Sequence, residues 1–118
     1  MNELLRTQNE SWGFYGTMSS TGKSEESWNL AFNLLLKATK VNANCVRLFL
    51  DGTQGRHFAD EVKEHLSKGV DLKTSIQTVI AKWKIWKVPK GIQKRYNIKS
   101  TYNYIETFAL AYAIQNED

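Results

Sequence analysis

Apolar residues recur at three- and four-residue intervals along most of this chain, and a single proline, Pro89, interrupts it. That spacing places apolar side chains on one face of an α-helix, whereas the alternation typical of half-buried strands is almost absent. A length of 118 residues suits one domain, and a hydrophobic fraction of 42% is sufficient for a core. The pattern predicts an all-α single domain over residues 1–118, a compact bundle of about five helices.

Capping residues and glycines set the expected helix limits. Asn42 and Asp71 predict two helix starts, because Asn and Asp side chains accept hydrogen bonds from the first free N–H groups of a helix. Ser24 predicts another, since Glu25 and Glu26 follow it where the helix dipole favours acids. The expected helices run from Ser24 to about Thr39, from Asn42 to Gly52, from about Arg56 to Ser67, from about Leu72 to Lys87, and onward from a cap at Ser100 or Thr101.

The segments between and before these helices are expected to be irregular. The turn Gly52-Thr53-Gln54-Gly55 separates the second and third helices, and a basic connector, Lys90 to Lys99, with a short turn from Gln93 to Tyr96, precedes the last. Residues 1–20 contain an aromatic-glycine cluster, Trp12 to Thr17, and are expected to lie as an irregular segment across the helices. Residues 116–118 are expected to form a frayed tail.

Targeting and redox signals are sparse. The N-terminus lacks the basic start and apolar run of a secretory signal, and the longest apolar run, Phe108 to Ile114, is too short to span a bilayer. We therefore expect a cytoplasmic protein without a membrane partner. The single cysteine, Cys45, lies among Val46, Leu48 and Leu50, which indicates a buried structural thiol.

The charge is concentrated in one stretch. Residues 73–105 carry eight basic residues and no Asp or Glu, whereas residues 1–72 sum to −1 and residues 106–118 hold three acids and no base. The net charge of +4 is therefore generated by this stretch alone. A concentrated positive field attracts polyanions, whereas a dispersed one mostly aids solubility.

This basic stretch is interleaved with aromatic residues and is the candidate nucleic-acid surface. Lysines neutralise phosphates without regard to sequence, and exposed Trp or Tyr rings stack on unpaired bases. Docking of an acidic protein and a solvated face without a partner remain alternatives. Trp83 lies mid-stripe on its helix and Trp86 at the edge of the stripe, and core burial is the expectation for both. The candidate contacts are Lys82, Lys84, Lys87, Lys90, Lys94, Arg95 and Lys99.

Three strings of the sequence resemble a group of small, uncharacterised proteins encoded on bacterial plasmids and integrative mobile elements. They are the opening Trp12-Gly13-Phe14-Tyr15-Gly16-Thr17, the pattern Leu50-Asp51 followed after three residues by Gly55-Arg56-His57-Phe58-Ala59-Asp60, and the pair Trp83-x-x-Trp86. The resemblance covers most of residues 12–105, and the Gly-Arg-His-Phe-Ala-Asp string is its most distinctive part. It implies a pattern and no activity.

The string around His57 allows several interpretations. A carboxylate such as Asp51 or Asp60 could orient the imidazole for proton transfer, but helix-end and surface pairing explain these residues more simply, so an enzyme is a minority interpretation. His57, Glu61 and His65 follow one another at four-residue intervals, which spreads them over ~12 Å of helix, too far for one metal ion. We therefore expect no metal and no cofactor.

A helix-turn-helix is a further option, because two short helices about a four-residue turn suit that motif. Asp60, Glu61 and Glu64 on the second helix argue against it, since they would face DNA phosphates.

The sequence thus favours a non-enzymatic mobile-element accessory protein that contacts the DNA or RNA backbone. The alternative is a protein-docking adaptor or inhibitor, whose exposed rings would form an apolar patch. Its candidate contacts are Trp12, Phe14, Tyr15, Arg56 and His57.

Overall fold

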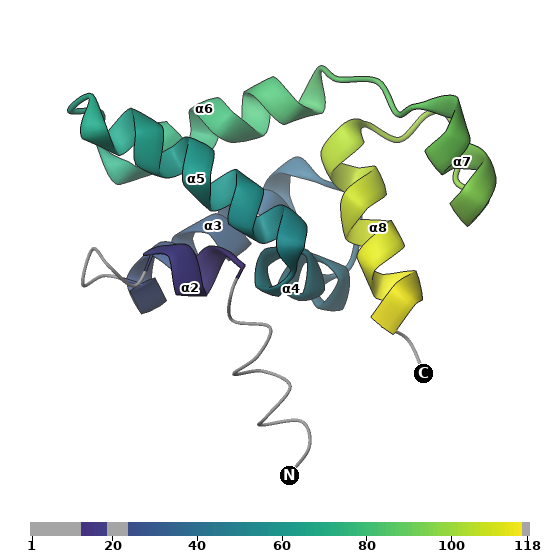
Figure 1. Ribbon diagram of the computed structural model, residues 1–118, viewed down its shortest axis with the longest axis horizontal. Coiled ribbons are helices and arrows are strands. Elements are labelled where there is room, and N and C mark those ends of the chain that lie inside the picture. The colour runs from purple at the N-terminus through teal and green to yellow at the C-terminus, as the bar shows by residue number, and fades with distance from the viewer. Residues whose placement is uncertain (1–12, 19–23, 117–118) are drawn as a thin grey trace, which may run out of the picture.

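The computed structural model describes residues 13–18 and 24–116, and all of its regular structure there is helical. The predicted all-α class is confirmed, although these residues contain seven helices instead of about five, because two short ones are added (Figure 1). No helix in the described ranges is long and apolar enough to cross a membrane. The helices are α2 (Phe14–Met18), α3 (Ser24–Ala38), α4 (Ala43–Asp51), α5 (Thr53–Ser67), α6 (Leu72–Lys84), α7 (Lys90–Tyr96) and α8 (Tyr104–Asn116).

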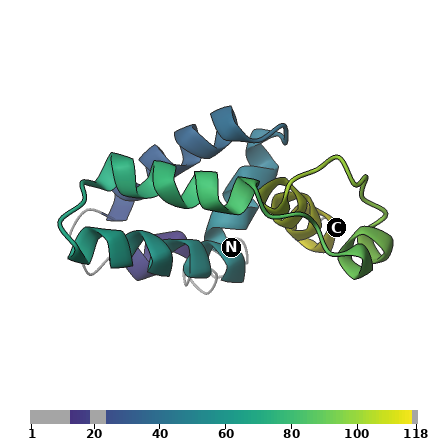
Figure 2. The same ribbon diagram turned by 90° about the horizontal axis from the view of Figure 1, so that it is seen from above.

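One core joins six of the seven helices. α5 packs against α6, α2 lies against α3 and α5, and α8 packs against α4 and the end of α6. α7 and α8 lie towards one end of the molecule in both views (Figures 1 and 2). Burial of the apolar stripes of these helices drives their association. The largest fully buried side chains include Phe14, Met18, Leu35, Leu50, Phe49, Phe58, Ile76 and Ile105.

Two predicted caps are confirmed. The Asn42 side chain accepts a hydrogen bond from the Cys45 N–H at 2.9 Å, and Asp71 accepts one from the Thr74 N–H at 3.0 Å. Each bond satisfies an N–H group that has no partner within the helix. Cys45 is buried, as its apolar neighbours predicted.

The junction of α4 and α5 differs from the prediction. The turn expected at residues 52–55 is reduced to one residue, Gly52, and α5 already begins at Thr53. A Cβ atom on Gly55 would lie within 3.0 Å of the Leu50 carbonyl oxygen, as would a Cβ atom on Gly13. The two glycines therefore allow the start of α5 and the residue before α2 to approach the end of α4 at backbone distance.

This close junction does not have the spacing of a helix-turn-helix, the option that the charges of the second helix already disfavoured. A reading helix in that motif follows a turn of three or four residues, whereas only Gly52 separates α4 from α5. The face of α4 formed by Val46, Phe49 and Leu50 is buried in the core. In this structure α4 and α5 pack against each other and each contributes buried residues to the core.

Three other limits move as well. The cluster expected to be irregular is helical from Phe14 to Met18, whereas residues 1–12, 19 and 20 lie outside the described residues. α6 ends at Lys84, three residues before the expected Lys87. Of the expected tail, Asn116 is the last residue of α8, and residues 117–118 are not among those described.

Candidate nucleic-acid interface

The connections before and after α7 are fixed to each other. The Tyr104 N–H donates to the Trp86 carbonyl at 3.1 Å, and Lys87 and Asn103 form an isolated antiparallel bridge. The Gln93 side chain donates to the Val88 carbonyl at 2.9 Å, which ties α7 to the strand-like segment before it. Residues 85–88 and 102–104 are thereby held side by side.

α7 itself is a surface element. It has no buried residue, and the buried side chains of Val88 and Ile98 anchor its two ends. Asn97 ends it in the left-handed conformation, with φ of 52°, a region that asparagine tolerates. The expected short turn from Gln93 to Tyr96 is therefore a full helix that begins one residue after Pro89.

A groove of about 510 Å³ opens between the two fixed connections. Lys84, Lys87 and Lys90 line it together with residues 100–103. Ile85, Trp86 and Tyr102 add apolar and aromatic surface. The groove therefore combines positive charge with aromatic rings, which is the composition that single-strand binding grooves share.

The two tryptophans of the Trp-x-x-Trp pair have different environments. Trp83 is 5% exposed, and its ring packs edge-on against Phe49 and Phe58 at centroid distances of 6.0 and 5.7 Å. Trp86 is 46% exposed and meets the ring of Tyr104 edge-on at 5.6 Å. Of the two, only Trp86 can therefore offer a ring to a partner. The expected core position is confirmed for Trp83 and wrong for Trp86, because α6 ends at Lys84, before Trp86.

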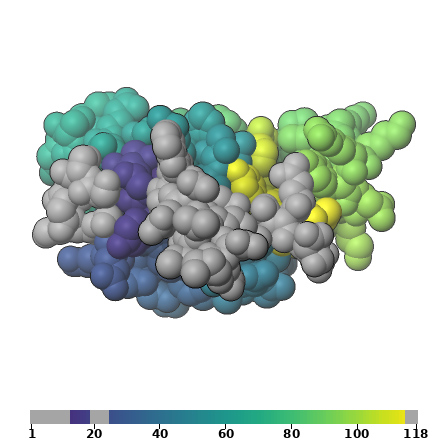
Figure 3. Space-filling view, turned by 60° about the horizontal axis from the view of Figure 1, so that its bottom comes forward, coloured from purple at the N-terminus to yellow at the C-terminus, as the bar shows by residue number. Residues whose placement is uncertain are grey.

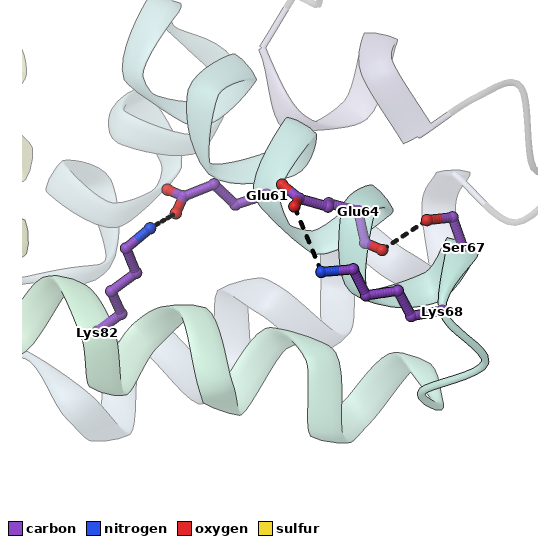
Figure 4. Close-up of polar contacts among 5 residues, drawn as sticks. All are labelled: Glu61, Glu64, Ser67, Lys68 and Lys82. Carbon is purple, nitrogen blue, oxygen red and sulfur yellow. Dashed lines mark hydrogen bonds and ion pairs between the residues drawn. The ribbon is translucent and has the colours of Figure 1, made fainter.

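Lys82 is partly neutralised. Its Nζ lies 2.5 Å from Glu61 Oε1 (Figure 4), and Glu61 Oε2 accepts a hydrogen bond from the indole N–H of Trp83. The hydrogen bond to Glu61 raises the pKa of Lys82 above its ordinary value. The same Nζ lies 5.6 Å from the centre of the Trp86 ring. Lys82 therefore pairs with α5. Because Glu61 lies 21 residues away in the sequence, no local pattern predicts this pairing.

The other six candidate cations form what we call the cationic end: Lys84, Lys87, Lys90, Lys94, Arg95 and Lys99. All six are exposed. Within residues 13–18 and 24–116, none of them makes an ion pair with a carboxylate. In the space-filling view the light-green atoms of this segment project at one end of the molecule (Figure 3). Arg95 lies over the Tyr96 ring at 5.5 Å.

The residues predicted for protein docking are not brought together as one exposed cluster. Phe14 is fully buried against the ring of Phe58, so it cannot be a docking contact. Tyr15 is 37% exposed, and Arg56 and His57 are exposed on α5. Trp12 lies outside the described residues.

The arrangement around His57 does not resemble an acid/base site. Asp51 accepts a hydrogen bond from the Trp28 indole at 2.9 Å, and the exposed imidazole of His57 bonds to no carboxylate in the described segments. In the series His57, Glu61 and His65, the carboxylate of Glu61 accepts hydrogen bonds from Lys82 and from the Trp83 indole. The described residues contain no cluster of three or more potential metal ligands.

The sequence analysis did not include residues 100–103 in the candidate interface, although a capping pattern at Asn103 indicates that these residues precede the last helix. Asn103 and Glu106 have the spacing of a capping box. The Asn103 side chain accepts from the Glu106 N–H at 2.9 Å and donates to the Glu106 carboxylate at 3.2 Å. The cap of α8 is therefore Asn103, and the expected caps Ser100 and Thr101 line the groove instead.

No family model, curated protein or solved structure matches this chain. The functional assignment therefore depends on the geometry and charge of the cationic end and its groove.

Proposed function

We propose that this protein binds the phosphate backbone of nucleic acid through the cationic end, as an accessory protein of a mobile element. The observation that carries the proposal is the absence of ion pairs at Lys84, Lys87, Lys90, Lys94, Arg95 and Lys99 within the described part of the chain. Glu61 neutralises only Lys82, and Glu106, the acid nearest in sequence, is buried at the start of α8. The acids among the described residues therefore leave this positive field uncompensated on the surface.

The placement of these cations supports the same function. α7 carries three of them, Lys90, Lys94 and Arg95, and contributes no buried residue to the core. A short helix that adds nothing to the core and presents cations to solvent is suited to a polyanion. Arginine and lysine side chains bind phosphates without reading the base sequence, so we expect binding with little sequence preference.

A salt titration tests the proposal. Binding of a labelled duplex and a labelled single strand should weaken between about 50 and 200 mM salt, with a slope of log K against log salt of roughly −0.7 to −0.9 for each phosphate neutralised. Changing four groups of the cationic end to Gln should reduce the magnitude of that slope by up to about 3. The variant is Lys84→Gln, Lys87→Gln, Lys94→Gln and Arg95→Gln.

A matched control removes the same charge from exposed positions elsewhere on the molecule. It combines Lys37→Gln, Lys40→Gln, Arg47→Gln and Lys73→Gln, all exposed in the structure. The control should retain most of the affinity and of the salt slope. Equal losses in both variants, or binding that does not respond to salt, would show that the cationic end is not the binding surface.

The protein-docking alternative has less support. The aromatic cluster on which it depends has its Phe14 ring in the core, and Met18 of the same helix is buried too. The exposed remainder, Tyr15 with Arg56 and His57, is no large apolar patch.

A further inference from the structure

Trp86 is held in place while its ring remains accessible. Its carbonyl accepts the Tyr104 N–H, its ring packs edge-on against the Tyr104 ring, and the ammonium of Lys82 lies 5.6 Å from the ring centre. Glu61 in turn holds Lys82. Despite these contacts the side chain is 46% exposed. An aromatic ring that is fixed before a partner arrives loses little conformational freedom on binding.

The neighbours of Trp86 extend this apolar platform. Four large hydrophobic side chains are exposed among the described residues, and two of them, Ile85 at 78% and Trp86, are consecutive in the groove. Tyr102 and Asn103 line the same groove. Exposed apolar surface of this kind, next to lysines, fits a ligand with both a flat apolar face and negative charge.

A nucleotide whose base is unpaired has that combination. In a duplex each base is stacked between its neighbours, so only the base edges and the phosphates face a protein. An unpaired base can turn its flat face to an aromatic side chain while its phosphate meets a cation. The groove is of small-ligand size, about 510 Å³, and suits one or a few nucleotides, whereas a double helix would meet only the lysines at its rim.

We infer that the groove takes unpaired nucleotides, with a base stacked on Trp86 and phosphates on Lys84, Lys87 and Lys90. The protein therefore prefers single-stranded DNA or RNA to duplex. This inference rests on the proposed function and adds to it the strand state of the nucleic acid.

The test compares a single-stranded and a double-stranded probe at the same low salt concentration. One is a fluorescent oligothymidylate of about 15 nucleotides, near the upper end of single-strand site sizes, and the other is a fluorescent duplex of equal length. Fluorescence anisotropy gives both dissociation constants. The wild-type protein should bind the single strand more tightly than the duplex.

Variants of the ring separate stacking from charge. Trp86→Ala should weaken single-strand binding by about 5- to 140-fold, the range found for one stacked base, and change duplex binding less than about twofold. Trp86→Phe, which keeps an aromatic face, should restore most of the lost affinity. Tyr15→Ala removes an aromatic side chain of similar exposure far along the chain, on α2, and should change neither constant. Far-UV circular dichroism checks that each variant is folded.

The outcomes distinguish the two claims. Salt-dependent binding that is equal for both probes, or that Trp86→Ala weakens equally for both, overturns the inference and leaves the proposed function standing. Absence of salt-dependent binding to either probe overturns both. If a polyglutamate peptide binds in place of the nucleic acids, the partner of the groove is an acidic protein, and both claims fall.

Discussion

Trp83 and Trp86 are three residues apart, but the structure predicts very different costs for removing each ring. Trp83 is nearly fully buried, and its ring contacts aromatic rings from α4, α5 and α8, among them Phe49, Phe58 and Phe108. Trp86 lies beyond the end of α6 and shares one ring contact, with Tyr104. The comparison therefore tests whether the aromatic core is assembled around Trp83.

The magnitudes follow from burial. Truncation of a buried Trp to Ala removes the apolar transfer energy and leaves a cavity, which together cost about 3–5 kcal/mol. For Trp83→Ala that is a large part of the roughly 5–15 kcal/mol that stabilises a domain. Trp86→Ala loses one edge-on ring contact and partly buried area, about 1 kcal/mol. The expected difference between the two variants is therefore about 2–4 kcal/mol.

Urea unfolding followed by far-UV circular dichroism measures both costs without depending on tryptophan fluorescence. The free energies are compared at equal m-value, since a changed m-value would indicate a changed denatured state. Trp83→Phe supplies an intermediate, because it keeps a buried ring and loses the N–H that donates to Glu61. Equal destabilisation by Trp83→Ala and Trp86→Ala would refute the assignment of Trp83 to the core and Trp86 to the surface.

Three further predictions use the same unfolding and titration assays. Gly55→Ala should destabilise the protein by about 1–3 kcal/mol, because the new Cβ would clash with the Leu50 carbonyl. Gly91→Ala, whose new Cβ has no neighbour within 4 Å, should be neutral or stabilising. Equal changes in unfolding free energy for the two variants would contradict this assignment of the two glycines. Glu61→Gln should free Lys82 for phosphate and steepen the salt slope by about 0.7–0.9, whereas an unchanged slope would place that lysine outside the interface. The Thr74 N–H lowers the pKa of Asp71 below 3.8, so its stabilising contribution is present above pH 3.8 and is lost as the pH falls through the lower folded value. Asp71→Asn, which caps without titrating, should therefore lose less stability in acid than wild type; parallel pH profiles would contradict this.

The parts of the fold that were predictable are those fixed by a few consecutive residues. Asn42 and Asp71 were identified as caps from their residue type and from the helical pattern that follows each, and in the structure each accepts a hydrogen bond from the backbone N–H three residues further along. The limits that moved depend on distant segments. Gly55 was predicted to belong to a turn, but it lies inside α5, where the absence of a side chain allows the end of α4 to approach closely. No local pattern encodes that approach.

The site was predictable in composition and not in shape. The sequence showed a run of cations without acids, which is a property of the chain itself. The groove required a contact between Trp86 and Tyr104, eighteen positions apart, which no local pattern predicts. Helical periodicity placed Trp83 in the apolar stripe correctly, but it could not show that α6 ends at Lys84 and turns Trp86 outward.

Two glycine-containing segments, Gly13 to Thr17 and Gly55 to Asp60, have a structural role in this chain. Gly13 and Gly55 allow close backbone approach to the end of α4, and the rings of Phe14 and Phe58 pack against each other in the core. These residues therefore specify the junction of α2, α4 and α5, and a chain that shares them has reason to share that junction. α7, with no buried residue, is free of this constraint. Its charges, on Lys90, Lys94 and Arg95, can be changed without disturbing the core, so substitutions of these three residues should report on binding with little effect on the fold.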